Sequence, residues 1–317
     1  MQLYSECLYC MFEHHWSLVR DHPDEARKAA FMREVLRTVA EADPGIAPPV
    51  PTARLQRIYA AQFAEQDDYP RLKRRYNELV MTWLPELRAA LAAADDPLKL
   101  AAWMAMAGNY IDFGVLKEVD DARLKRMLST PDERAVGTPA FARLRADVRA
   151  AKRLVYACDN CGEVVLDLLL MEELKRENPA LEITALVRGE NVLNDVTAED
   201  ARAVGLDRVA KIVGNGSNIG GTQMQFLGGE ARAAMLAADV IVAKGQGNFE
   251  TLSGSGLNVY YLFLAKCPHY TKWFGMEHMA GQLLHEPLDA VAPVVDLIAD
   301  LGHLVEIVEL ALFKGGQ

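Results

Sequence analysis

The chain has 317 residues, of which 51% are hydrophobic and 25% are charged, and its formal net charge is −10. This length and composition predict one large α/β domain with a smaller appendage, and they exclude a disordered or collagen-like chain. An acidic protein repels nucleic acid and anionic lipid on average, so we expect neither as a partner.

The amino end shows no basic segment followed by an apolar core, and no stretch is long and uncharged enough to span a bilayer. Five cysteines, an odd number, do not form a secreted disulfide framework and fit a reducing compartment better. We therefore expect a cytoplasmic protein with no membrane partner. The sequence does not define its oligomeric state.

Residues 1–150 are rich in helix-forming residues, and apolar positions recur at helical spacing, as in residues 79–91. This pattern predicts a helical domain. Prolines cluster between residues 44 and 51 and recur at Pro70 and Pro131, which predicts loops at these three places.

From residue 153 onward, short apolar runs alternate with helical stretches. The helical stretches include residues 164–177 and 198–204, and the apolar runs are 154–157, 183–187, 209–213, 240–243 and 259–264. This alternation predicts a Rossmann-like, mostly parallel sheet with flanking helices in a domain that spans residues 151–317. Residues 288–313 are compatible with a final strand or a helix.

Unusual polar residues follow four of the predicted strands, in segments 159–160, 194–195, 214–218 and 244–248. Because the carboxyl ends of parallel strands share one edge of a sheet, all four segments are expected to face one crevice. For any single segment, an ordinary strand end or helix cap is an equally good interpretation. The conjunction of four favours a ligand site.

The residue types in these segments indicate the chemistry. Asp159, Asn160 and Asp195 offer two carboxylates and an amide oxygen, which are hard ligands suited to Mg²⁺ or Mn²⁺. Glycine-rich backbone and Lys244 suit phosphate oxygens. Neither glycine loop completes a known nucleotide-binding fingerprint, so a dinucleotide oxidoreductase is weakly supported.

Five sequence segments carry a resemblance to a known protein family. Residues 158–167 (CDNCGEVVLD), 193–197 (LNDVT) and 243–250 (AKGQGNFE) resemble the damage-control phosphatases, also called domain of unknown function 89. Residues 6–10 (ECLYC) and 108–113 (GNYIDF) resemble the prokaryotic branch with an amino-terminal Cys-x-x-Cys. The resemblance implies a helical region on a Rossmann-like core, and metal-dependent hydrolysis of small phosphate monoesters such as sugar phosphates or damaged metabolites.

The resemblance also implies roles for single residues. A divalent metal (Mn²⁺, Mg²⁺, Co²⁺ or Ni²⁺) would be held by Asp159, Asn160 and Asp195, and Lys244 would bind the phosphoryl group. The residues implied to contact substrate are Glu163, Gly216, Ser217, Asn218, Asn109 and Asp112. Cys161 stands where a small residue is expected in the family. The catalytic residues would be Asp159 and Lys244, and either the Asp159 carboxylate or a metal-bound water could be the nucleophile.

Two other functions stay open. A Rossmann-like core with acidic strand ends also suits an S-adenosylmethionine-dependent carboxyl methyltransferase, and a protein that binds a phosphorylated ligand without turnover would share the same pocket.

The cysteines allow a second hypothesis. Cys7 and Cys10 have the spacing of half a zinc site, which His14, His15 or Cys267 would complete, although two thiols packed in a helical bundle explain the spacing equally well. Cys158 and Cys161 have the same spacing, but they flank the predicted metal ligands and are interpreted as bystanders.

Overall fold

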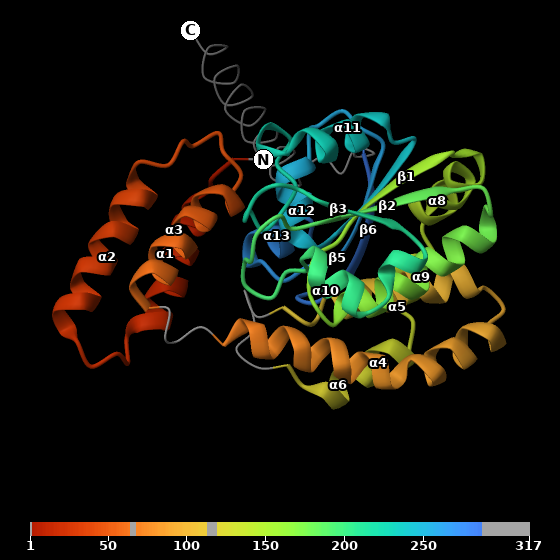
Figure 1. Ribbon diagram of the computed structural model, residues 1–317, viewed down its shortest axis with the longest axis horizontal. Helices are drawn as coiled ribbons and strands as arrows, with labels where there is room; N and C mark the ends of the chain where they lie inside the picture. The colour runs from red at the N-terminus through yellow and green to blue at the C-terminus, as the bar shows by residue number, and fades with distance from the viewer. Residues whose placement is uncertain (1, 64–67, 113–118, 287–317) are drawn as a thin grey trace, which may run out of the picture.

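The computed structural model describes residues 2–63, 68–112 and 119–286. Its centre is a six-stranded sheet with the order β3-β2-β1-β4-β5-β6, in which only β6 is antiparallel to its neighbour (Figure 1). The strands are β1 (Arg153–Ala157), β2 (Glu182–Val187), β3 (Lys211–Gly214), β4 (Val240–Lys244), β5 (Val259–Leu264) and β6 (Gly281–His285). The predicted α/β class with a mostly parallel sheet is confirmed.

The strand order reverses next to β1. From β1 the chain adds β2 and β3 on one side, and then returns to add β4 on the other side. The carboxyl ends of β1 and β4 therefore flank a topological switch point, where open α/β sheets bind their ligands.

The α-helices fall into two groups by their place in the chain. Those before the sheet are α1 (Ser5–Val19), α2 (Glu25–Ala40), α3 (Pro49–Phe63), α4 (Tyr69–Ala93), α5 (Pro97–Gly108), α6 (Asp121–Ser129), α7 (Glu133–Val136) and α8 (Pro139–Ala150). Those between or after strands are α9 (Glu163–Glu177), α10 (Ala198–Ala203), α11 (Gly229–Ala237), α12 (Gly245–Leu252) and α13 (Pro268–Trp273). Short 3-10 turns cover Leu206–Arg208 and Met224–Phe226.

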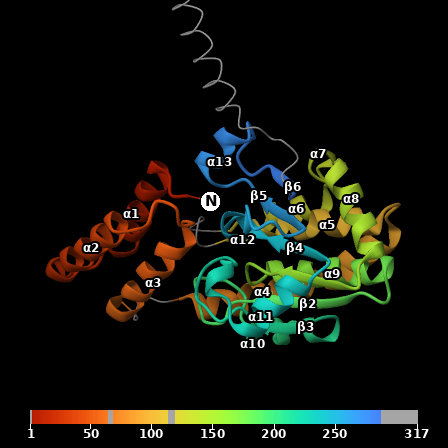
Figure 2. The same cartoon turned by 90° about the horizontal axis from the view of Figure 1, so that it is seen from above.

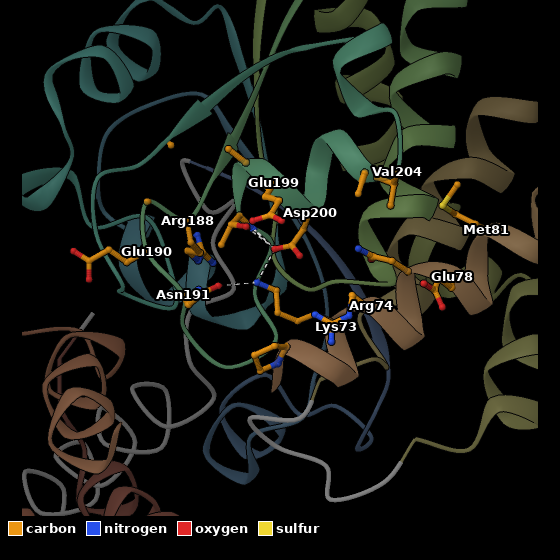
Figure 3. A pocket seen from close by; sticks show the side chains of 17 residues that line it. Lys73, Arg74, Glu78, Met81, Arg188, Glu190, Asn191, Glu199, Asp200 and Val204 are labelled. Atoms are coloured by element: carbon orange, nitrogen blue, oxygen red, sulfur yellow. Dashed lines mark hydrogen bonds and ion pairs between the residues drawn. The ribbon is translucent and has the colours of Figure 1, made fainter. Parts of the chain in front are cut away.

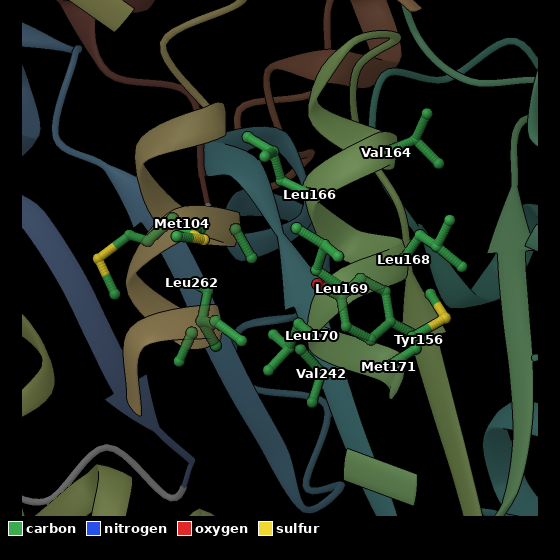
Figure 4. Packing of buried hydrophobic residues seen from close by; sticks show 14 of the residues in the cluster. Met104, Tyr156, Val164, Leu166, Leu168, Leu169, Leu170, Met171, Val242 and Leu262 are labelled. Atoms are coloured by element: carbon green, nitrogen blue, oxygen red, sulfur yellow. The ribbon is translucent and has the colours of Figure 1, made fainter. Parts of the chain in front are cut away.

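Helices cover both faces of the sheet. On one face α4, α5 and α9 share a core with Tyr156, Val242 and Leu262, and Figure 4 shows the apolar side chains of α5 and α9 gathered over these strand residues. On the other face α11, α12 and α13 pack on a second core that includes Val155 and Tyr261 (Figure 1). Each leucine buried in these layers contributes roughly 1.5–3 kcal/mol, which holds α9 and its charged residues in the interior.

The first three helices form a separate lobe with its own small core around Phe31 and Phe63 (Figures 1 and 2). The lobe touches the rest of the chain through α1, where Glu6 lies 3.8 Å from His269 of α13, and through α3, where the Ala53 carbonyl oxygen accepts a hydrogen bond from Asn218 at 3.3 Å. Helices before residue 150 thus contribute to two cores, one of which includes the sheet. The division into domains 1–150 and 151–317 stays a prediction.

The observed element boundaries differ from the predicted ones at several points. Pro49, Pro51 and Pro70, which the sequence assigns to loops, occupy the first turns of α3 and α4, where proline needs no backbone donor. The third strand begins two residues later than predicted because a 3-10 turn precedes it. The antiparallel edge strand β6 is not predicted, and residues 288–313 lie outside the described part of the chain.

No described helix is both long enough and apolar enough to cross a membrane.

Candidate active site

Acidic residues meet at the switch point. Asp159 and Asn160 follow β1, and an isolated antiparallel bridge joins Asn160 to Asp195 in the loop after β2. Gly245, directly after β4, has φ +76°, and a Cβ there would lie 1.9 Å from Oδ2 of Asp159. Only glycine allows the chain to turn this close to the carboxylate. The structure therefore brings the predicted metal ligands into one buried cluster.

A buried arginine joins the two carboxylates. The guanidinium group of Arg188, 1% exposed, donates from Nε to Asp195 at 2.6 Å and from Nη2 to Asp159 at 3.3 Å. Its Nη1 donates to the carbonyl oxygen of Gly221 at 3.2 Å. Arg188 is not among the residues predicted from the sequence. It stands directly after a buried strand, which is the same signal that identified the other four segments.

Two asparagines connect Asp159 to Glu163. The side-chain nitrogen of Asn160 donates to Oδ2 of Asp159 at 2.8 Å and to Oε2 of Glu163 at 3.0 Å. That of Asn109, at the end of α5, donates to the same two oxygens, each at 3.1 Å. The predicted site residues Asn109 and Glu163 thus lie beside the cluster. Asp112 lies nearby and accepts a hydrogen bond from Lys266 at 2.6 Å.

Lys244 is fully buried, and its ammonium group donates within the protein. The acceptors are Oε1 of Glu163 at 2.6 Å, Oδ1 of Asp167 at 2.7 Å and the carbonyl oxygen of Ala105 at 2.8 Å. An ammonium group has three donors, and all of them are used here. Tyr156 donates to the same oxygen of Asp167 at 2.7 Å. The role of Lys244 as a phosphate-binding residue stays a prediction, and its observed partners are two carboxylates.

Burial and mutual repulsion shift the pKa values of the cluster. Burial, with repulsion from Asp195 and Glu163, raises the pKa of Asp159 well above its usual range. Burial also raises the pKa of Asp195 and brings that of Asp167 to about 6. Burial disfavours the charged form of Lys244, but the attraction of Asp167 and Glu163 outweighs it and raises the pKa of the ammonium group.

Negative charge exceeds positive charge in this cluster and its direct neighbours. The acids are Asp112, Asp159, Glu163, Asp167 and Asp195, and the bases are Arg188, Lys244 and Lys266. When all eight groups are ionised, five carboxylates against three cations leave a formal excess of two negative charges, which a bound divalent cation would neutralise.

The donor set fits a hard divalent metal. Asp159 and Asp195 supply carboxylate oxygens, and Oδ1 of Asn160 accepts no hydrogen bond from any residue that the structure describes. Within residues 2–63, 68–112 and 119–286, no group of three or more His, Cys, Asp or Glu side chains has metal-binding geometry. The predicted set differs from such a group because one of its three ligands is an amide.

The asparagine side chains of the glycine loop after β3 bind backbone groups of the protein. Asn215 accepts hydrogen bonds from the backbone of Gly189 at 2.8 Å and of Ser217 at 2.9 Å, and Asn218 binds α3. Gly216 has φ +84°, and Gly189 packs directly against it. Farther along the loop, a Cβ on Gly220 would lie 3.9 Å from Oδ2 of Asp195. The substrate contacts of Gly216, Ser217 and Asn218 stay predictions.

A cavity of about 630 Å³ lies between α4, α10 and the loop after β2 (Figure 3). Arg188 lines it, and Lys73 projects into it while bonding to Asn191 at 3.0 Å and Asp200 at 2.6 Å. A second cavity of about 160 Å³ shares Lys73 and Asn191 and reaches the lobe at α3. Lys244 lines neither cavity. Arg188 connects the larger cavity to the carboxylates.

The cysteines are all free thiols. Cys158 and Cys161 are buried, and burial raises both pKa values well above the usual range, so neither is a reactive thiolate. Burial raises the pKa of Cys7 to about 11. The zinc site at Cys7 and Cys10 stays a hypothesis, since the described residues hold no such ligand group.

These features define an α/β protein with a buried acidic cluster at the switch point of a doubly wound sheet. The family model of the damage-control phosphatase ARMT1-like domain matches residues 3–280, and the chain belongs to this family. A damage-control phosphatase from Archaeoglobus fulgidus is 34% identical over 224 residues, which cover 70% of this chain and 76% of the relative. An uncharacterized protein, MJ0202, from Methanocaldococcus jannaschii is 26% identical and covers 86% of this chain and 91% of its own.

A solved structure of a family member has a similar fold. The crystal structure of a DUF89 family protein (PH1575) from Pyrococcus horikoshii has a TM-score of 0.76 and 25% sequence identity, and it covers 90% of this chain and 99% of its own. The names of the relatives support a phosphatase-type function, that is, a hydrolase that acts on phosphate esters.

Proposed function

We propose that the chain is a divalent-metal-dependent phosphatase that hydrolyses small phosphate monoesters, with sugar phosphates or damaged phosphorylated metabolites as its substrates. The observation that carries this proposal is the formal excess of two negative charges in the buried cluster that contains Asp159 and Asp195 at the switch point. Together with the family, it favours a site built for a cation and an anionic ester.

Asp159, Asn160 and Asp195 would hold the metal, and oxygen ligands of this kind accept Mn²⁺, Mg²⁺, Co²⁺ or Ni²⁺. When bound, the metal would neutralise charge on the phosphoryl oxygens as the leaving group departs.

Hydrogen bonds from protein groups hold the Asp159 carboxylate in place before a metal binds. Oδ2 of Asp159 accepts from Asn109 and Asn160, and Oδ1 accepts from Arg188. A carboxylate held by three donors is a fixed ligand and a weakened nucleophile, which favours attack by water over an aspartyl-phosphate intermediate.

The larger cavity is the proposed place for the body of the substrate. Arg188 lies both in its wall and against the two carboxylates, so an ester in the cavity would direct its phosphoryl end toward the acidic cluster. The charged and amide side chains in its wall, such as Lys73, Asn191 and Asp200, suit the hydroxyl groups of a metabolite.

The test is a panel of phosphate monoesters assayed for inorganic phosphate after chelation and addition of single divalent metals. We expect metal-stimulated release that Asp195→Asn abolishes and that Asp207→Asn, on the exposed 3-10 turn before β3, leaves unchanged. Methyl transfer from S-adenosylmethionine, or binding of esters without turnover, would contradict the proposal.

A further inference from the structure

The amide of Asn160 has one orientation that presents an oxygen to a metal and one that presents a nitrogen. We propose that Glu163 and Lys244 are positioning residues that fix the first orientation. This inference rests on the proposed metal ligand set, and it gives Lys244 a role that the sequence does not suggest.

Hydrogen bonds define the orientation of the amide. Both donors of the Asn160 nitrogen are used, one by Oδ2 of Asp159 at 2.8 Å and one by Oε2 of Glu163 at 3.0 Å. A carboxylate that binds a metal is ionised, and ionised carboxylates only accept hydrogen bonds. In the metal-binding state, a flipped amide would therefore place its oxygen against two other acceptor oxygens. The observed arrangement therefore turns Oδ1 away from both carboxylates, toward the side where a ligand oxygen is needed.

Lys244 keeps Glu163 in place. Its ammonium group binds Oε1 of Glu163 at 2.6 Å and is itself held by Asp167 at 2.7 Å, and all three side chains are fully buried. Oε2 is left to accept from the two asparagines. Because β4 carries Lys244 and α9 carries both acids, the orientation of Asn160 depends on two packed elements and not on a loop.

Asn109 has an independent restraint. Its nitrogen donates to the same two carboxylate oxygens as Asn160, but its Oδ1 accepts a hydrogen bond from the backbone nitrogen of Leu264 at 3.2 Å. Asn109 therefore cannot turn without losing a backbone partner. Asn160 is the one of the two amides that is free to flip when Glu163 changes.

Glu163→Gln tests this reasoning because it changes one oxygen to a nitrogen at constant shape. If Oε1 of the glutamine keeps the bond to Lys244, its nitrogen meets the nitrogens of Asn109 and Asn160, and Asn160 turns its oxygen inward to accept. The metal site then loses an oxygen ligand. We expect the Kd for Mn²⁺ alone, measured by calorimetry or by electron paramagnetic resonance, to rise about 10- to 100-fold, the usual effect of losing an orienting partner.

Glu173→Gln is the matched control, since Glu173 lies on the same helix, is also buried and pairs with Arg176 away from the site. It is expected to leave Mn²⁺ affinity unchanged. Thermal unfolding of the metal-free variants shows whether both are folded.

A second change should restore binding. Asn160→Asp in the Glu163→Gln background has acceptor oxygens on both sides, so residue 160 accepts from the glutamine and still offers an oxygen to Mn²⁺. We expect the double variant to bind Mn²⁺ at least about 5-fold more tightly than Glu163→Gln alone, a conservative share of the loss.

The outcomes separate the two proposals. If the wild-type chain binds no Mn²⁺, the proposed function and this inference both fail. If the wild type binds Mn²⁺ but Glu163→Gln binds it equally well, or if the second change gives no recovery, only the orienting role fails, and Glu163 and Lys244 form an ion pair that serves the core alone.

Discussion

Arg188 donates to Asp195 across 2.6 Å at the carboxyl edge of the sheet, where both side chains are buried. The same guanidinium group reaches Asp159, so a single cation compensates part of the charge of two predicted metal ligands. Without a metal, Arg188 is the main neutralising partner of both carboxylates.

Arg188→Met is therefore expected to destabilise the metal-free protein strongly. Removing one partner of a buried ion pair costs about 3–5 kcal/mol, and Mn²⁺ should recover part of this loss because it supplies the missing positive charge. Arg57→Met is the control, because Arg57 and Glu190 form an exposed pair that contributes at most about 1 kcal/mol. Urea unfolding with and without Mn²⁺ measures both. Equal losses for the two variants would contradict the assignment.

Gly245→Ala should abolish most of the phosphatase activity. The new Cβ would lie 1.9 Å from Oδ2 of Asp159, and the residue would also hold φ +76°. Gly254→Ala separates the two effects, since Gly254 has φ +84° and no described atom lies within 4 Å of the position that its Cβ would take. We expect about 1–2 kcal/mol of destabilisation from the strained backbone in both variants, with lost activity only at Gly245. Parallel assays of phosphate release and unfolding check this, and an inactive Gly254→Ala would overturn it.

Asn77→Ala should weaken the loop that carries Asp159. Oδ1 of Asn77, on α4, accepts from the backbone nitrogen of Gly162 at 2.6 Å, and Gly162 has φ +83°. Alanine leaves this buried N–H without its partner, at a cost of about 1–3 kcal/mol. Glu86→Ala, on the exposed side of the same helix and outside both cavities, is the control. Chemical unfolding and phosphate release measured on both variants decide whether this contact matters, and indistinguishable results would rule it out.

Glu250 predicts a pH dependence of stability away from the metal ligands. Burial raises its pKa from the ordinary 4.5 to about 7, so the folded protein keeps a proton that the unfolded chain has already lost between these values. Stability should fall as pH rises from about 4.5 to about 7, by on the order of 1–3 kcal/mol, and then level off. Asp159, Asp167 and Asp195 also have raised pKa values and add to this fall, so Glu250→Gln should remove only the part that Glu250 contributes.

The control for that experiment is Glu230→Gln on the exposed face of α11, which should follow the wild-type curve. Free energies of unfolding between about pH 4.5 and about pH 8 give the comparison. A slope as steep in Glu250→Gln as in the wild type would show that Glu250 does not contribute and that the other buried acids account for it.

The sequence predicts the fold class and the meeting of Asp159, Asn160 and Asp195 because parallel strands end at one edge, a rule that needs no coordinates. It does not predict Arg188 as their partner, since the direction of a side chain after a strand depends on the loop. The partners of Lys244 were visible in principle: Glu163 and Asp167 stand four residues apart in an otherwise apolar helix segment, on one face. The edge strand β6 is not predicted because it runs antiparallel to β5. Such a strand needs no crossover helix before it and contributes no ligand segment to the shared edge of the sheet.

The ion cluster of Lys244, Glu163 and Asp167 also constrains the order in which the chain can assemble. During synthesis Glu163, the first residue of α9, leaves the ribosome 81 residues before Lys244. Until β4 arrives beside β1, docking α9 on the sheet would bury two acids without a cation, which is unfavourable. We therefore expect the central helix to pack stably only after the fourth strand is made, so that the site and the core are completed together.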